Sequence, residues 1–474
     1  MIRGALLSSL VTKEVRALWP AWLASLAAMT ADAVVDLGPF RGLGIAAFFF
    51  GSATLGALSI GHEYQHRTMT WLLSQPARRA HLLLVKLSVL VPMLLTIGAV
   101  AAVVGFPRVH LESQRLWFAW LPVLYVLCVA PWLTMVFRSA LAGAIFTLSL
   151  PGAALTVGQL LYVAAYQRVL PEHAVITILW RASIVLCAVG AVMSWRTFMR
   201  LEAIDGPASD LSLQWLRWPG TAAAGAPALM KGDPIWLLIK KEFRLQQMSL
   251  VVGGLYVVGH LGAASLRPMF SHSKDVFDAL TVFYVLLISL FIGSVASAEE
   301  RQLGTLEWQT LLPVASSKQW AVKVGFVLSL ALLLGLGLPL LTSFNPDITR
   351  RLWPQLAFSV IAIAIAGLYV SSACASGLWS MLISLPAVFG VLSLVMFLRV
   401  RLELLLARTV NLALIRFDSA LEPLMTAALL VLLLWFALAN HRSADRSARR
   451  IWIQGLWLTG CVTAGMVISV LVAR

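Results

Sequence analysis

The sequence is poor in charged residues. Only 12% of its 474 residues are Asp, Glu, Lys or Arg, whereas 60% are hydrophobic. Soluble globular domains carry roughly 25% charged and about 45–50% apolar residues. This imbalance excludes an ordinary water-soluble domain, and lipid is the expected solvent for most of the chain.

The sequence also lacks most of the common motifs of catalysis and nucleotide binding. No Gly-x-x-x-x-Gly-Lys-Ser/Thr segment occurs, so the chain has no loop of that type to hold nucleotide phosphates. Gly-x-Ser-x-Gly and paired intramembrane aspartates are missing as well. His62-Glu63-Tyr64-Gln65-His66 has the spacing of His-Glu-x-x-His, but no carboxylate-rich set of ligands accompanies it. We therefore expect no catalytic residue and no cofactor on this chain, and we disfavour a membrane-embedded enzyme.

Metal-ligating residues are few. The four cysteines all fall in apolar stretches without paired spacing, which is typical of small buried side chains. His62, His66 and His81 lie near one another in the sequence, but no carboxylate-rich set accompanies them. We interpret the histidines as polar interface residues and expect no metal site.

The sequence contains many long apolar runs. Each run has about 18 to 22 residues, and an α-helix of that length crosses a hydrocarbon core of about 30 Å. The sequence thus predicts an all-α, polytopic membrane protein. The predicted spans are residues 18–36, 43–61, 84–106, 116–137, 140–163 and 174–195, then 248–266, 279–298, 320–342, 353–371, 377–398 and 420–440, then an extra C-terminal span at 451–472.

The net charge of +15 fits membrane topology better than nucleic-acid binding, because the basic residues form short clusters beside the apolar runs. If the spans alternate in direction, 22 of the 36 Lys and Arg residues fall on one face. Cytoplasmic loops keep positive charge. We expect a protein of a bacterial cytoplasmic membrane with its N-terminus and the linker inside and its C-terminus outside.

The two halves of the chain repeat each other. Five residue types of the first half recur in the second at one constant offset, 300 − 63 = 237, without a gap. Such self-similarity predicts an internal duplication. The matching pairs are Glu63 and Glu300, Thr68 and Thr305, Trp71 and Trp308, Pro76 and Pro313, and Lys86 and Lys323.

The repeat also covers the segment before each first span, since Lys13-Glu14-Val15-Arg16 matches Lys241-Glu242-Phe243-Arg244. Six spans in each copy make the copies parallel. The predicted fold is two parallel six-helix transmembrane repeats plus one extra span. The predicted domains are a first half at 1–200, a Gly-, Ala- and Pro-rich linker at 201–234, a second half at 235–448 and the extra span at 449–474.

Each half resembles the permeases of type-2 ABC exporters. The resemblance rests on the Lys-Glu-x-Arg segment and on the Glu, Gly-Thr, Trp and Pro that follow the second span; it covers nearly the whole chain except the linker and the last span. It implies an interfacial helix before each first span and a coupling helix after each second span. It further implies a partnership with two copies of a cytoplasmic ABC ATPase subunit that bind ATP and Mg²⁺.

Under this resemblance, the coupling loops contact the ATPase. The alternative is that their cations only mark the cytoplasmic side, but topology does not explain the repeated Glu, Thr, Trp and Pro. Helical spacing of apolar residues predicts one amphipathic helix through 72–86. The candidate coupling residues are Glu63, Thr68, Trp71, Pro76, Arg78 and Arg79 in the first half, and Glu300, Thr305, Trp308, Pro313 and Lys318 in the second. In the first half Arg67 replaces the glycine of the motif.

Glu63 and Glu300 follow the ends of predicted spans, where the helix dipole disfavours an unpaired carboxylate. A cation is therefore expected beside each. We predict that Glu63 approaches Lys13 or Arg16, and that Glu300 approaches Lys241 or Arg244. These contacts would tie each interfacial helix to its coupling loop.

Arg181 is a single charge within the predicted sixth span. A charge inside a membrane is costly and indicates function by default, here contact with an anionic group of a substrate or lipid. Alternatively, Arg181 reaches the interface or pairs with Glu422.

The leading hypothesis is the permease of an ATP-driven exporter that moves an amphiphilic, drug-like or lipid-like substrate by alternating access. Its partners would be the ATPase subunits and membrane lipid, with no nucleic acid. The alternative is an ion-coupled secondary transporter with parallel six-span repeats. That class needs titratable groups within the spans, whereas the acidic residues here gather at span ends and in loops.

Overall fold

The computed structural model is almost entirely helical over the residues that it describes, and these contain no strand. The described residues are 2–34, 43–66, 68–75, 77–105, 115–166, 172–201, 234–264, 273–304, 314–342, 346–374, 376–384, 387, 415–443 and 448–472. Nearly all of the predicted linker at 201–234 and most of the predicted span at 377–398 lie outside them.

Five helical segments among the described residues are long and apolar enough to cross a membrane. They are Arg79–Val103, Ala119–Phe137, Thr177–Met199, Ser316–Thr342 and Leu356–Ala373. Each matches a predicted span to within a few residues. The all-α polytopic membrane class is therefore supported, and seven further predicted spans fall on helices of the structure.

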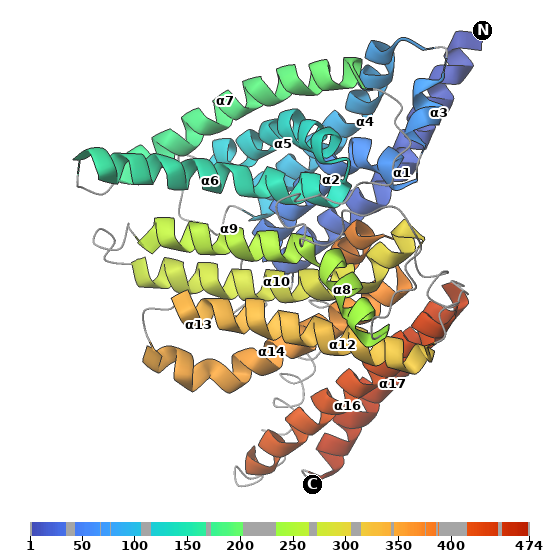
Figure 1. Cartoon of the computed structure of the whole chain (residues 1–474), viewed down its shortest axis with the longest axis vertical. Coiled ribbons are helices and arrows are strands. Elements are labelled where there is room, and N and C mark those ends of the chain that lie inside the picture. The colour runs from blue at the N-terminus through green and yellow to red at the C-terminus, as the bar shows by residue number, and fades with distance from the viewer. Residues whose placement is uncertain are drawn as a thin grey trace. The chain divides into compact units, whose positions relative to one another are not determined.

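The chain divides into two compact units, one formed by Met1–Gly232 with Gly254–Asp278 and the other by Asp233–Gly253 with Ala279–Arg474. The helices that precede the predicted linker are coloured blue to green in Figure 1. They are α1 (Ile2–Val34), α2 (Leu43–Gln65), α3 (Met69–Leu73), α4 (Arg79–Val100), a π-helical turn (Ala101–Gly105), α5 (Arg115–Phe137), α6 (Ala140–Tyr166) and α7 (Glu172–Met199).

Helix α2 is the centre of this group, because it contacts α1, α4, α5 and α6. Glycines allow the close approach. A Cβ atom on Gly61 would lie 2.3 Å from Ala140 Cβ, and one on Gly56 would lie 2.6 Å from Val126 Cγ1. Small residues let helix backbones pack tightly inside a membrane, where apolar burial against lipid gives little driving force.

The remaining helices run from green to red in Figure 1. They are α8 (Pro234–Leu245), α9 (Gln247–Ala264), α10 (Ser273–Leu303), α12 (Ser316–Leu332), a π-helical turn (Leu333–Gly337), α13 (Leu338–Thr342), α14 (Pro346–Ala373), α16 (Ile415–Arg442) and α17 (Ala448–Val472). In the second unit α12 contacts α8, α14 and α16, and α17 contacts α16. Gln454 of α17 and Asn440 of α16 exchange amide hydrogen bonds of 2.9 and 3.3 Å, which fasten the extra helix to its neighbour.

Two local expectations are wrong. The segment Lys13–Arg16 does not belong to a separate interfacial helix, because α1 runs unbroken from Ile2 to Val34. In the second half, α8 and α9 are distinct helices that meet at Gln246.

The amphipathic helix predicted through 72–86 is also interrupted, since α3 ends at Leu73 and α4 begins at Arg79. Pro76 accounts for the interruption, because a proline disfavours helical conformation in the residue before it.

Candidate functional site

A buried ion network joins α1, α2 and α4. Its members are Lys13 and Glu14 of α1, Glu63 of α2 and Lys86 of α4, and we call this set the first ion network. Lys13 Nζ lies 2.7 Å from Glu63 Oε1. Lys86 Nζ lies 2.7 Å from Glu14 Oε1 and 3.1 Å from Glu63 Oε1, and it donates a further 3.0 Å hydrogen bond to the Ser59 carbonyl.

A second network repeats this arrangement. It comprises Lys241 and Glu242 of α8, Glu300 of α10 and Lys323 of α12, and we call it the second ion network. Lys241 and Lys323 both contact Glu300, and Lys241 Nζ lies 2.9 Å from Glu242 Oε1. Lys323 Nζ lies 3.7 Å from the same Glu242 oxygen.

The duplication extends to a backbone group. Lys323 Nζ donates a 3.1 Å hydrogen bond to the carbonyl of Ala296, just as Lys86 donates to Ser59. Ser59 and Ala296 are related by the same offset (296 − 59 = 237) that relates Lys86 to Lys323. The repeat found in the sequence therefore corresponds to equivalent contacts within each unit.

Each network has two cations and two anions, so its formal charge is balanced. Glu14, Glu63 and Lys86 are at most 4% exposed, and Glu242, Glu300 and Lys323 at most 2%. Buried charges are tolerated when they are paired and hydrogen-bonded. Removal of any one member would leave the network with a net charge, and the neighbours of that member with one partner fewer, in a low-dielectric setting.

The first network keeps its central carboxylate ionised. Burial opposes ionisation of Glu63, but the charge of Lys86 and the hydrogen bonds from Lys13 and Thr68 outweigh it and lower the pKa of Glu63 from 4.5 to about 2. Burial likewise opposes ionisation of Glu300, and the charges of Lys323 and Lys241 lower its pKa to about 2.

Glu242, the fourth member of the second ion network, has fewer hydrogen-bond partners than the carboxylates described above. Burial raises the pKa of Glu242 above its usual value, although Lys323 acts against the increase. Its Oε2 atom has no hydrogen-bond partner in the described part of the chain. The second network therefore leaves a carboxylate oxygen unsatisfied, whereas Thr68 donates a hydrogen bond to Glu63 Oε2 in the first.

The geometry decides between the cations predicted for each glutamate. Lys13, and not Arg16, contacts Glu63, and Lys241, and not Arg244, contacts Glu300. Arg16 and Arg244 are exposed. Sequence reasoning missed Glu14, Glu242, Lys86 and Lys323 as members of these sites. The signal was available, because all four lie in the repeated segments and a repeated lysine is not required by topology.

The candidate coupling segment of the first half packs its apolar face inward. Met69 and Leu72 of α3 are buried in a cluster with Leu10 of α1, Leu82 of α4 and Phe198 of α7. The same short helix leaves Trp71 56% exposed. The Nζ atom of Lys13 lies 5.4 Å from the centroid of a Trp71 ring, so the exposed tryptophan adjoins the first ion network.

Thr68 and Arg79 fix the two ends of this segment. The Thr68 hydroxyl donates to Glu63 Oε2, and its backbone N–H donates to the Glu63 carbonyl at 2.9 Å. Arg79 Nη1 donates a 2.6 Å hydrogen bond to the carbonyl of Met199 at the end of α7. Arg78 precedes α4 in an extended conformation and is exposed.

Less of the second coupling segment is described. Thr305, Trp308 and Pro313 lie outside the described residues, as does Pro76 of the first segment. Lys318 is exposed in the first turn of α12. Gly304, directly after α10, has φ +71°, a left-handed conformation that favours glycine and commonly ends helices.

Arg181 is separate from both networks. It lies near the start of the apolar segment Thr177–Met199 of α7 and is exposed. The side chain of Glu422, its alternative partner, lies outside the described residues. The rings of His62 and His66 are 4.4 Å apart, while His81 is exposed. No group of three or more metal-binding side chains occurs among the residues described.

The site has no precedent among the proteins compared. No family model, curated protein or solved structure matches the chain. The function must therefore be argued from the duplicated networks and the segments attached to them.

Proposed function

We propose that the chain is the membrane permease of an ATP-driven exporter, with two six-span permease halves fused in parallel and one additional C-terminal span. Separate ABC ATPase subunits, two copies in each complex, bind ATP and Mg²⁺ in the cytoplasm. The N-terminus, the linker and both coupling segments face the cytoplasm, and the C-terminus lies outside.

One observation carries this proposal: the same four-residue ion network occurs in both halves, at the base of the segment that follows each second span. Each network fixes the end of that span to α1 or α8 and to the next span. A force applied to the attached segment therefore acts on three helices together. Two equivalent segments suit a partner that is itself present in two copies.

The side chains of the first coupling segment suggest how a bound ATPase would transmit force to the helix bundle. Trp71 is exposed while its neighbours Met69 and Leu72 are anchored in the apolar cluster. A partner that binds Trp71 and Arg78 would move α3 with the bundle, because Thr68 and Arg79 secure the segment at either end. Closure of the ATPase subunits would then change the side to which an amphiphilic substrate has access.

The test is purification of the full chain from its native membranes. A P-loop ATPase should co-purify, and ATP hydrolysis should follow the complex and not the chain expressed alone. Trp71→Ala should reduce retention of the ATPase, whereas Trp195→Ala, which removes another exposed tryptophan on α7, should not. ATP hydrolysis by the isolated chain, or equal retention by both variants, would refute the proposal.

One observation favours the alternative, an ion-coupled transporter. Burial raises the pKa of Glu299, just beyond the predicted span 279–298, to about 8, and its Oε2 has no partner in the part of the chain described. Such a group could exchange a proton near neutral pH. Efflux of an amphiphilic dye that stops on collapse of the proton gradient, persists on ATP depletion and is lost in Glu299→Gln would support it over the ATP-driven mechanism.

A further inference from the structure

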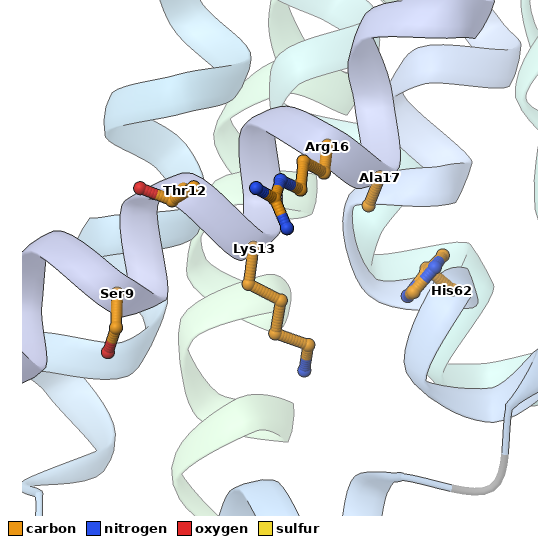
Figure 2. A pocket seen from close by; sticks show the side chains of 6 residues that line it. All are labelled: Ser9, Thr12, Lys13, Arg16, Ala17 and His62. Atoms are coloured by element: carbon orange, nitrogen blue, oxygen red, sulfur yellow. The ribbon is translucent and has the colours of Figure 1, made fainter.

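An open cleft of about 550 Å³ lies beside the first ion network. Figure 2 shows the six residues that line it: five project from α1, and His62 comes from the end of α2. They are Ser9, Thr12, Lys13, Arg16, Ala17 and His62. The lining contains two cations, two hydroxyls and an imidazole, and it contains no carboxylate.

The two cations of the cleft, Lys13 and Arg16, differ in whether they can bind an incoming anion. Lys13 is held by Glu63 within the network. Arg16 is exposed and makes no ion pair with any residue that the structure describes. Burial and the neighbouring His66 lower the pKa of His62 to about 4, so that its ring is neutral at physiological pH. Arg16 is therefore the charge that an incoming anion would meet.

The same helix has an apolar stripe next to this cationic face. Val11, Val15, Trp19 and Leu23 are each 37% to 48% exposed, and they recur every fourth residue, which places them along one side of α1. Trp19 is about one turn beyond Arg16. Tryptophan is enriched where a helix passes from the headgroup region into hydrocarbon, so we expect Arg16 at headgroup level.

We propose that this cleft binds the phosphate headgroup of an anionic phospholipid. The Arg16 guanidinium pairs with the phosphodiester, the hydroxyl-lined wall of the cleft holds the polar part of the headgroup, and the acyl chains lie along the apolar stripe. A soluble acidic segment would satisfy Arg16 but would leave the adjoining stripe uncovered. The cleft would thus position a lipid directly against the first ion network. This inference needs the chain to be in a membrane and does not depend on its energy source.

The experiment is native mass spectrometry of the full chain in detergent, titrated with dilauroyl phosphatidylglycerol, dilauroyl phosphatidylcholine or inorganic phosphate. The phosphatidylglycerol should be retained preferentially. Arg16→Gln should weaken its binding about fivefold, as expected for one basic side chain at an anionic surface. Arg449→Gln, which removes an exposed arginine of α17, should leave binding unchanged.

A second variant guards against a folding defect in the first. Thr12 is exposed, so Thr12→Asp places a carboxylate in the cleft without disturbing the buried network, and it should abolish the preference for phosphatidylglycerol. Equal retention of both lipids, or equal loss in Arg16→Gln and Arg449→Gln, would overturn the proposal. Competition by inorganic phosphate as strong as by the lipid would assign the cleft to a free anion instead. None of these outcomes bears on ATPase binding.

Discussion

Lys86 of α4 and Glu14 of α1 form a buried ion pair of 2.7 Å across 72 residues of sequence. Both side chains are almost completely removed from solvent. Because Lys86 also contacts Glu63, a single ammonium group joins three helices. Lys323 occupies the equivalent position in the second half, where it contacts Glu300 and lies near Glu242.

Replacement of this shared cation should be severely destabilising. Lys86→Met leaves Glu14 and Glu63 buried with one fewer partner, and loss of one member of a buried pair typically costs about 3 to 5 kcal/mol. We expect a large fall in the thermal unfolding temperature of the full chain in detergent. Lys323→Met should behave alike.

Lys318→Met is the matched control, because Lys318 is an exposed lysine on the same helix as Lys323. Its effect should stay within about 0.5 kcal/mol. If the control and Lys323→Met unfolded at the same temperature, the second ion network would have no role in stability.

The first ion network should also make stability depend on pH. The pKa of Glu63 is about 2 in the folded chain and 4.5 ordinarily. An acid whose pKa is lowered by folding stabilises the fold above its unfolded pKa, and that stabilisation is lost as pH falls from about 4.5 towards 2. Unfolding temperatures recorded over this range should fall steeply for the native chain.

Glu63→Gln cannot make this titration, so its unfolding temperature should be lower at neutral pH and vary less below pH 4.5. Glu299→Gln serves as the control, because the pKa of Glu299 is raised to about 8 and not lowered. That variant should retain the acid-dependent loss. An unchanged acid profile in Glu63→Gln would show that Glu63 is not the titrating group.

Periodicity predicted most of the helices, because a run of about 20 apolar residues has few alternatives to a membrane helix. The glutamate–lysine pairs were predictable since a carboxylate at a helix C-terminus needs a cation. The sequence did not identify Lys86 and Lys323 as members of the ion networks, because a lysine beside an apolar run usually extends to water. Hydropathy does not show that a buried carboxylate lies within reach of the lysine. The break between Leu73 and Arg79 does not show in the spacing of apolar residues, which continues on both sides of Pro76.

The proposed topology places both coupling segments on one side of the membrane. Single cysteines at Ser74 and at Ser317, both exposed, should react together with a membrane-impermeant maleimide from the cytoplasmic side, in a chain whose four cysteines are replaced by alanine. A cysteine at Tyr166, which is 65% exposed at the end of α6, should react only from outside. Labelling of Ser74 and Ser317 from opposite sides would exclude parallel halves, and with them the coupling mechanism.

Gly293 should tolerate alanine poorly although it lies within a helix. Glycine to alanine in a helix interior ordinarily stabilises by roughly 0.5–1 kcal/mol. A Cβ atom on Gly293, however, would lie 2.3 Å from the carbonyl oxygen of Ala364, which belongs to the backbone of α14 and has no rotamer to adopt. The helices would have to separate, so Gly293→Ala should lower the unfolding temperature.

Gly325 provides the matched comparison, because a Cβ atom there meets nothing within 4 Å. Gly325→Ala should be neutral or stabilising, and opposite signs for the two variants would identify steric contact, not helix propensity, as the cause. Gly56 is related to Gly293 by the offset of the repeat (293 − 56 = 237) and closely approaches α5. Gly56→Ala should therefore share the sign of Gly293→Ala, with a smaller effect because its nearest atoms are side-chain methyl groups. If Gly56→Ala were stabilising while Gly293→Ala was destabilising, the two halves would not share this helix contact.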